Sequence, residues 1–305
     1  MNRFARTGLQ QDDHRTGVTL AAIGMFVLSF DALLVRLADV AAWDIVFWRG
    51  WLVCLALTIY LVAARQLSQI RLLKQFWVAT LVIAALYALG SSLFVFSIKL
   101  TKVANTVLIL SCTPFCAALF SWFILGERIR LRTVIAMLAA TTGIVVVFAG
   151  AAGFGDGLHD VVGSFLALLI ALITGLTLTL LRKYAALPLI PILALSGAVA
   201  GLLALPFANP LGTEAESLGW LMVMGLVQIP IAWICALTAT RYIPAPEVSL
   251  FLLIETVLGP VWVWLVLGEI IPPLTLFGGI FILGAVCIHA WLGMRETLQG
   301  QPTLS

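Results

Sequence analysis

Charge is the property this chain has least of. Only 10% of its 305 residues are Asp, Glu, Lys or Arg, whereas 62% are hydrophobic. A water-soluble domain of this length would need more polar surface to cover its core, so the composition excludes a soluble globule and indicates an integral membrane protein. The net charge of +3 is small, and nothing in it indicates nucleic acid as a partner.

Groups that support enzymatic or metal chemistry are also scarce. The three histidines, His14, His159 and His289, lie outside or near the ends of the apolar stretches, so no acid and base constellation at membrane depth is expected. No Gly-xxxx-Gly-Lys-Ser/Thr loop occurs, which excludes direct use of ATP by this chain. The five cysteines lie inside apolar runs and are interpreted as packing residues. We therefore expect no enzyme, no cofactor and no metal, and a process driven by gradients.

What the chain does have is ten apolar stretches of about twenty residues, each long enough to cross a bilayer as a helix. Polar segments 1–16 and 293–305 are interpreted as cytoplasmic tails, and the connections between stretches are too short to hold a soluble domain. The predicted spans are 17–38, 43–63, 75–98, 103–125 and 131–149, then 161–181, 190–208, 218–240, 245–267 and 274–292.

The basic residues are distributed very unevenly between the two sides of these spans. With the N-terminus inside, thirteen of the seventeen Lys and Arg residues fall on inner segments, which the positive-inside rule favours. An even number of spans then places the C-terminus inside as well. The thirteen are Arg3, Arg6, Arg15, Arg65, Arg71, Lys74, Arg128, Arg130, Arg132, Arg182, Lys183, Arg241 and Arg295.

The second half of the chain repeats the first. Residues 103–127 align without a gap on residues 245–269, an offset of 142 positions, and both segments end in Leu-Gly-Glu. Each repeat has five spans, an odd number, so the two copies cross the membrane in opposite directions. The sequence thus predicts an all-α polytopic membrane protein with two inverted five-helix repeats, 17–149 and 161–292, joined by an external connector, 150–160. Such folds place a substrate site near the midplane at the repeat interface.

The segment from Pro114 through Leu-Gly-Glu127 resembles the EamA family of the drug/metabolite transporter superfamily, and the likeness extends over nearly the whole chain. In that family a proline in the fourth helix and a closing Leu-Gly-Glu recur in each repeat. The second copy departs from this, because Thr256 stands opposite Pro114 and Pro260 follows one turn later. The resemblance implies an exporter of small metabolites, often amino acids, with a central cavity lined by helices one, three and four of each repeat.

Ionisable residues inside the spans are costly in a bilayer and therefore indicate function. Glu255 lies about ten residues from either end of its span, too deep to reach the interface. It is the leading candidate for binding a substrate ammonium or a coupled proton; the alternative is a protonated acid that bonds a neighbouring helix.

Asp31 and Arg49 lie at similar depth on adjacent antiparallel spans, about 10 Å in at 1.5 Å per residue. We expect an ion pair between them. The pair is either structural or an outer gate, and a substrate contact by Arg49 is the alternative.

Helix interruptions and aromatic residues complete the candidate site. Helix breaks or gating are expected at three prolines, because freed backbone groups at membrane depth are tolerated where they line a cavity. Side chains expected to contact substrate are one amide and two deep aromatics, for which simple packing is the alternative. These residues are Pro114, Pro230 and Pro260, then Gln228, Tyr87 and Trp233.

Two further features are interpreted as structural. Glu127 and Glu269 close the repeated segments and are expected to lie near the N-terminus of the following helix, where the dipole favours negative charge. Small residues at helical spacing, Gly197 with Gly201 and Ala139 with Gly143, permit close helix contact, and a homodimer is one use of such faces.

The sequence thus favours a secondary active transporter in the plasma membrane, the bacterial inner membrane in particular. It would export amino acids with apolar or aromatic side chains, or related compounds, with protons as a candidate coupling ion. One alternative is an antiporter for phosphorylated or nucleotide sugars, but such anions need several deep basic residues and only Arg49 is deep. Another is a non-transport intramembrane protein such as an enzyme. A channel would need a continuous polar stripe, which is missing.

Overall fold

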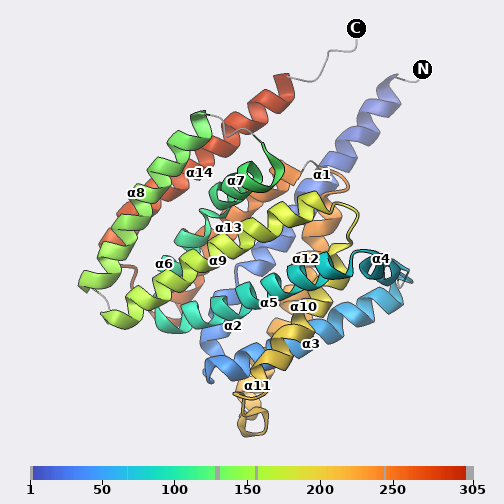
Figure 1. The fold of residues 1–305 in the computed structure, drawn as a ribbon. Coiled ribbons are helices and arrows are strands. Elements are labelled where there is room, and N and C mark those ends of the chain that lie inside the picture. Colours follow the sequence, from blue (N-terminus) through green and yellow to red (C-terminus); the bar gives the residue numbers. More distant parts are fainter. Residues whose placement is uncertain (1–2, 67, 128–130, 155–156, 244, 300–305) are drawn as a thin grey trace.

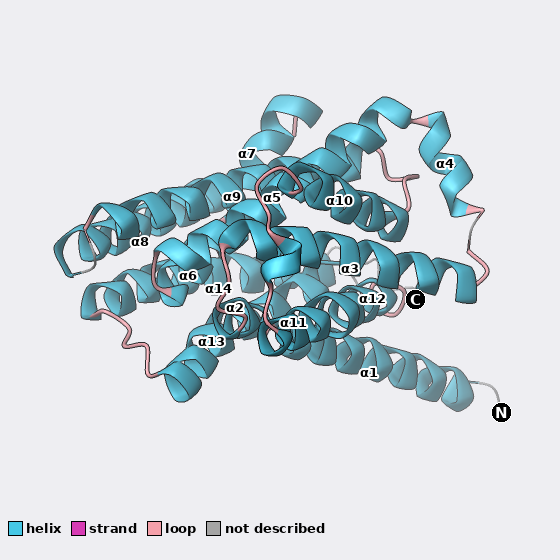
Figure 2. Ribbon diagram, turned by 90° about the horizontal axis from the view of Figure 1, so that it is seen from below, coloured by secondary structure: helices cyan, strands magenta, loops and turns pink. Residues whose placement is uncertain are grey.

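Helices make up all the regular structure in the described part of the chain, residues 3–66, 68–127, 131–154, 157–243 and 245–299 of a computed structural model (Figures 1 and 2). The first repeat contains α1 (Arg3–Leu28), α2 (Asp31–Leu37), α3 (Ala42–Ala63), α4 (Gln69–Gln75), α5 (Trp77–Leu100), α6 (Val103–Leu110), α7 (Thr113–Leu125) and α8 (Leu131–Phe154). The second contains α9 (Leu158–Lys183), α10 (Leu189–Ala204), η1 (Pro210–Gly212), α11 (Ala215–Met222), η2 (Val223–Gln228), α12 (Ile229–Ala239), α13 (Ala245–Leu267) and α14 (Pro273–Gln299).

Ten apolar helical stretches correspond to the ten predicted spans. Within the described ranges, seven are long and apolar enough to cross a membrane, and three shorter ones run over Leu189–Ala204, Ile254–Leu267 and Pro273–Ala285. Two of the seven contain a break between consecutive helices, and a third combines α11, η2 and α12. The prediction of an all-helical membrane protein is confirmed.

The first predicted span is not one helix. α1 ends at Leu28, Ser29 and Phe30 form a turn, and α2 begins at Asp31. Neither proline nor glycine marks this place; the Ser29 hydroxyl donates to the Phe26 carbonyl at 2.6 Å, and side chains from other helices stabilise the break as well. The turn also sets the ionisable Asp31 at the start of a new helix.

The fourth span breaks where the sequence indicated. α6 ends at Leu110 and α7 begins at Thr113, so that Pro114 occupies the first turn of α7, where its missing N–H costs little. The hydroxyls of Ser111 and Thr113 donate to the carbonyls of Leu108 and Leu110, both at 2.6 Å. These bonds satisfy carbonyls at the interruption.

The two other prolines behave differently from each other. Pro230 follows η2, a π-helical segment that ends at Gln228, so the ladder is irregular there as expected. Pro260, by contrast, lies inside α13, which continues through it as one helix. The expectation of a helix break at Pro260 is therefore corrected: no proline stands in the register of Pro114, and the chain keeps helical geometry on both sides of Pro260.

Helices of one repeat pack mainly on helices of the other. The closest partners are α3 with α10, α8 with α14, α5 with α9 and α1 with α12. Glycines allow two of these approaches, since a Cβ on Gly50 would lie 2.6 Å from the Gly197 carbonyl oxygen, and one on Gly143 would lie 2.6 Å from that of Gly278. Gly197, Gly201 and Gly143 thus serve packing within the chain, and a homodimer would use other surfaces.

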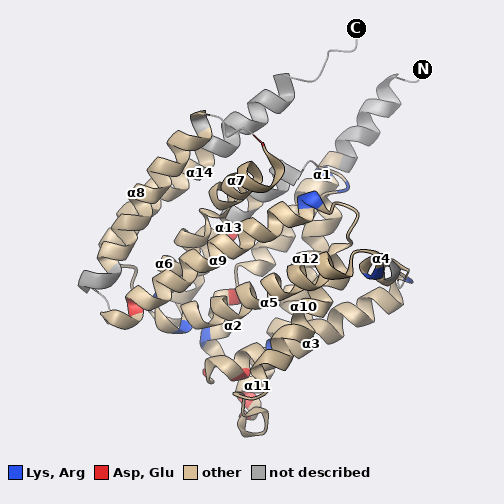
Figure 3. Cartoon of the chain, viewed as in Figure 1, with Lys and Arg blue, Asp and Glu red and all other residues tan. Residues whose placement is uncertain are grey.

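The bundle has two distinct ends. α1 begins and α14 finishes at one end, which we call the terminal end (Figure 1). The opposite, far end carries the connections that follow α2, α5, α10 and α13. Lys, Arg, Asp and Glu gather mostly near the helix ends and loops, with few along the middle of the bundle (Figure 3). Those few mark the candidate site.

Candidate functional site

A cavity of about 550 Å³ lies between the two repeats. This volume falls in the range of small-molecule sites, about 300–1,000 Å³. Its lining is mostly apolar, with ionisable side chains from Asp31, Arg49 and Glu255 and aromatic rings from Tyr87, Phe94 and Trp233. Hydroxyl groups add polar edges, from Ser91, Ser111, Thr113, Thr174, Thr177, Ser196, Thr240 and Thr256.

The cavity extends toward the terminal end. Its lining includes Leu178, Leu237 and Thr240, which lie in the last turns of α9 and α12 or just after them, and Leu178 and Thr240 are exposed. In the other direction the lining stops near Asp31, Arg49 and Phe94. The cavity therefore opens toward the terminal end and is closed toward the far end.

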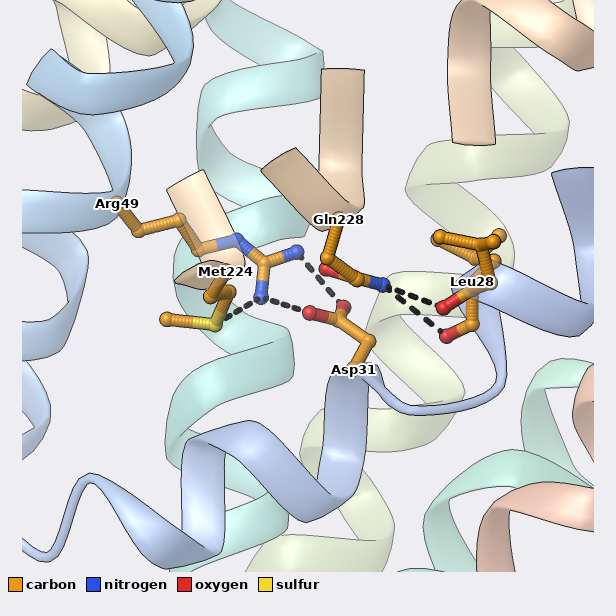
Figure 4. A network of polar contacts seen from close by, with 6 residues as sticks. Leu28, Asp31, Arg49, Met224 and Gln228 are labelled. Atoms are coloured by element: carbon orange, nitrogen blue, oxygen red, sulfur yellow. Dashed lines mark hydrogen bonds and ion pairs between the residues drawn. The ribbon is translucent and has the colours of Figure 1, made fainter. Parts of the chain in front are cut away.

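Asp31 and Arg49 form the expected ion pair (Figure 4). The guanidinium donates two parallel hydrogen bonds, from Nη1 to Oδ1 at 3.0 Å and from Nη2 to Oδ2 at 2.9 Å. Both side chains are largely buried, at 6% exposure for Asp31 and 12% for Arg49. Arg49 also lies over the ring of Phe94, 5.5 Å from its centroid. Bidentate geometry and the aromatic face hold the guanidinium in one orientation.

Gln228 supports the break that precedes Asp31. Its Nε2 donates to the carbonyls of Val27 and Leu28, at 3.2 and 3.3 Å (Figure 4). These two carbonyls lie in the last turn of α1, where the helical ladder ends. Gln228 is buried, and it is not one of the described residues that line the cavity. Its amide therefore acts on the backbone of α1 in this structure.

A second group from the other repeat fixes the same turn. The indole Nε1 of Trp262, on α13, donates to Oγ of Ser29 at 2.9 Å. The Trp262 ring also stacks on Phe30, with centroids 4.8 Å apart and planes inclined by 12°. The break in the first span thus depends on η2 and α13 together, both from the second repeat.

Glu255 lies on α13 and lines the cavity as predicted from its depth. No hydrogen bond or ion pair joins it to any described residue, although Asp31 and Arg49 line the same cavity. The alternative that Glu255 serves as a bonded structural acid has no partner to support it in this part of the chain. A carboxyl group that faces a cavity without a partner is available to a ligand.

Tyr87 and Trp233 approach each other across the cavity lining. Their rings meet edge to face, with centroids 6.4 Å apart and an interplanar angle of 86°. Tyr87 comes from α5 of the first repeat and Trp233 from α12 of the second, which are equivalent spans under the inverted repeat. Pro114 also lines the cavity, whereas Pro230 and Pro260 do not appear among the described lining residues.

The far end is closed by polar contacts that the sequence did not predict. Glu269 pairs with Arg36, with 3.0 Å between Oε2 and Nη2, and accepts the backbone N–H of Val103 at 2.7 Å. Arg36 Nη2 also donates to the Thr101 carbonyl at 2.9 Å. Below this layer Val35, Ile45, Val95, Ile98 and Leu221 are fully buried.

These contacts add to one expectation. Glu269 was expected to lie near the N-terminus of the following helix, and the partners that its side chain binds lie on α2 and at the start of α6 in the other repeat. Arg36 was not among the candidate residues predicted from the sequence, and its pairing with Glu269 is a finding of the structure. The one sequence feature that could have indicated this contact was the repeated Leu-Gly-Glu segment, at residues 125–127 and 267–269.

Metal ligands do not gather in the described part of the chain, where no group of three His, Cys, Asp or Glu residues lies close enough to hold an ion. The five cysteines, Cys54, Cys112, Cys116, Cys235 and Cys287, are free thiols. The described residues offer instead an apolar chamber with one carboxyl group that has no partner among them, one neutralised guanidinium and several hydroxyls. Such a chamber can bind a small amphipathic molecule reversibly.

Comparisons with known proteins agree with this architecture. A solved crystal structure of a protein aligns with 90% of this chain and 98% of its own, at a TM-score of 0.61 and 18% identity, a likeness that shows the fold alone. An uncharacterized transporter of Clostridium kluyveri is 28% identical over 207 residues, which are 64% of this chain and 66%, slightly less than two thirds, of that protein.

The model of the EamA-like transporter family matches twice, over residues 15–149 and 161–291, and so covers both repeats. That family is one of transporters and not of enzymes. The chain belongs to the EamA-like transporter family.

Proposed function

We propose that this protein is a secondary active transporter that exports small metabolites, with amino acids of apolar or aromatic side chain as the substrate class. The single observation that carries this is the cavity between the repeats, into which Glu255 and Arg49 present opposite charges beside aromatic rings. A zwitterion with an apolar side chain complements that combination. Transport would proceed by alternating access of the two repeats around the cavity.

Each part of such a substrate has a partner in the cavity. The α-ammonium would bind Glu255, which has no partner among the described residues. The α-carboxylate would approach Arg49 and compete with Asp31 for the guanidinium, because both are bidentate acceptors. The side chain would lie against Tyr87 and Trp233. Gln228 would contribute indirectly, by holding the turn that positions Asp31.

The same residues argue against phosphorylated or nucleotide sugars. Arg49 is the one basic side chain among the described lining residues, and Asp31 already neutralises it. A multiply anionic substrate would therefore meet a site whose remaining charge, on Glu255, is negative. Desolvating phosphate without compensating cations is strongly unfavourable.

We also propose that the terminal end faces the cytoplasm of a cell whose plasma membrane holds the protein, the bacterial inner membrane in particular. The excess of Lys and Arg on that side supports this orientation. The cavity would then be open to the cytoplasm, which is the state in which an exporter loads its substrate. Glu255 is our candidate for carrying a coupled proton, since it can bind either a proton or the ammonium.

The test is uptake of a panel of labelled amino acids into proteoliposomes that contain the purified protein, with empty liposomes as background. We expect saturable uptake of a few related apolar or aromatic amino acids, and loss or alteration of that uptake in Glu255→Gln. Glu216→Gln is the matched control, because Glu216 is exposed in the first turn of α11 and lies outside the described lining. Absence of uptake for every amino acid by folded protein would refute the substrate class, and equal uptake by both variants would refute the role of Glu255.

A further inference from the structure

The two Leu-Gly-Glu corners are equivalent in sequence but lie at opposite ends of the bundle. With the offset of 142, Gly126 corresponds to Gly268 and Glu127 to Glu269. Both glycines have left-handed backbone conformation, φ 70° and 69°, and end α7 and α13 in the same way. Each corner therefore projects its glutamate beyond the end of the fourth span of its repeat.

Each glutamate binds an arginine on the first span of the other repeat. Glu269 pairs with Arg36 on α2, and Glu127 pairs with Arg182 on α9 at 2.7 Å between Oε1 and Nη2. Counted from the first residues of the two family matches, 15 and 161, Arg36 and Arg182 each lie 21 positions into their repeat and so occupy equivalent positions. The two ion pairs are thus related by the inverted repeat, one at the far end and one at the terminal end.

The two pairs differ in burial and in their further described contacts, and these differences distinguish the closed end from the open end. At the far end Glu269 also accepts the N–H of Val103, the first residue of α6, and Arg36 donates to the Thr101 carbonyl. At the terminal end Arg182 is the one side-chain partner of Glu127 among the described residues. The side chain of Glu127 is 47% exposed and that of Arg182 is 59% exposed. The side chains of Glu269 and Arg36 are only 14% and 24% exposed.

The residue in register with Val103 is Ala245, the first residue of α13. In the present state Glu269, after α13, caps the start of α6, and the far end is closed. An inverted repeat makes the opposite state the mirror of this one, with Glu127, after α7, capping the start of α13 and the terminal end closed. The glutamate that follows the fourth span of one repeat would thus bind the first residue of the fourth span of the other repeat.

We propose that Glu269 and Glu127 are alternating gate residues. Each keeps its ion pair with its arginine in both states. Only one of them at a time binds the first N–H of the opposite fourth span, which is that of Val103 at the far end or that of Ala245 at the terminal end. This rests on the proposed alternating access but not on any substrate. The arginine orients the carboxylate, and the capping bond to the helix N-terminus supplies the state-dependent stabilisation.

Proline at the capped residue gives a sharp test, because it removes the backbone donor at a position where a helix accepts proline. Proline is accepted at the first position of a helix, and Lys102, which precedes Val103, already has the extended conformation that proline requires, φ −61° and ψ 139°. Val103→Pro therefore deletes the N–H bound by Glu269 without opposing the helix. Val103→Ala is the matched control, since it removes the buried side chain and keeps the N–H.

The measurement is the distance between pairs of spin labels in the purified protein, in nanodiscs and without substrate, in a background whose native cysteines are replaced. One label pair, at residues 102 and 270, reports the far end, and another, at residues 131 and 242, reports the terminal end. Loss of a hydrogen bond to a charged group corresponds to a change of about tenfold in a two-state ratio. We expect Val103→Pro to lower the ratio of far-end-closed to far-end-open molecules by about that factor and to shorten the terminal-end distance.

Three comparisons decide the proposal. Val103→Ala and Ala245→Pro should both leave the far end closed, the latter because its N–H is used only in the opposite state. Glu269→Gln should open the far end as Val103→Pro does, which keeps the test usable if the proline variant does not fold. Identical distance distributions for Val103→Pro and Val103→Ala would overturn the proposal, as would opening of the far end by Ala245→Pro. Because no substrate is present, these outcomes are independent of whether amino acids are the cargo.

Discussion

The ionisable side chains inside the spans are the residues that most strongly indicate a functional site, because placing a charge in a bilayer costs free energy. Arg49 and Asp31 lie deep in neighbouring spans and neutralise each other through two short hydrogen bonds. Glu255 lines the same cavity and has no partner among the described residues. The cavity thus contains one satisfied pair and one available carboxyl group, and the two should respond differently to substitution.

Breaking the pair from one side should destabilise the protein more than removing it altogether. We expect Arg49→Gln or Asp31→Asn alone to cost about 3–5 kcal/mol, because each leaves its buried partner uncompensated. The double variant should recover most of that loss. Thermal unfolding in detergent, followed by tryptophan fluorescence, measures all three. A double variant whose loss equals the sum of the single losses would show that the two residues are not coupled.

At the scale of elements, the broken first span depends on groups supplied by the second repeat. Gln228 on η2 bonds the carbonyls of Val27 and Leu28, and Trp262 on α13 bonds Ser29. The turn between α1 and α2 is therefore a tertiary feature. This explains why the sequence predicted the interruption at Pro114 but not the one at Ser29: proline is a recognisable local signal, whereas most of the contacts at Ser29 come from the second repeat.

Removing the amide of Gln228 should loosen this turn. We expect Gln228→Leu to lower stability by about 1–3 kcal/mol, since it removes the amide donor from the Leu28 carbonyl and leaves the Val27 carbonyl only the long bond from the Phe30 N–H, at 3.4 Å. Hydrogen exchange of the amides after residue 28 should also become faster in that variant. Gln228→Glu cannot donate to these carbonyls when ionised, so it should resemble Gln228→Leu. Unchanged exchange in Gln228→Leu would contradict the support that we assign to the amide.

Glycine contacts between spans allow a matched pair of substitutions. A Cβ on Gly143 would lie 2.6 Å from the Gly278 carbonyl oxygen, whereas a Cβ on Gly284 meets nothing within 4 Å. Gly143→Ala should therefore separate α8 from α14 and cost about 1–3 kcal/mol. Gly284→Ala should be neutral or stabilising, since alanine favours a helix by up to about 1 kcal/mol. Denaturation of both variants in the same detergent provides the comparison, and equal effects would contradict the close approach.

For the whole molecule, the sequence predicted the ten apolar helical stretches and the two repeats, because hydrophobic length and the rarity of charge are local signals. It did not predict how the far end closes. The bond between Val103 and Glu269 joins residues 166 positions apart, and no periodicity indicates which glutamate meets which backbone N–H. The state of the molecule, open at the terminal end, is a property of such long-range contacts and not of any one span.

Accessibility of the cavity from one side tests that state together with the orientation. Ser196 lines the cavity on α10, so Ser196→Cys, in a background without native cysteines, should react with a water-soluble thiol reagent that enters from the terminal end. With that end in the cytoplasm, inside-out membrane vesicles should label much faster than right-side-out ones. Lys102→Cys, at the far end, should show the reverse preference and so serves as the control. If Ser196→Cys were labelled faster in right-side-out vesicles while Lys102→Cys kept its preference, the cavity would open to the outside, and the resting state that we assign would be wrong. If both preferences were inverted, the cavity would still open at the terminal end and only the orientation in the membrane would need revision.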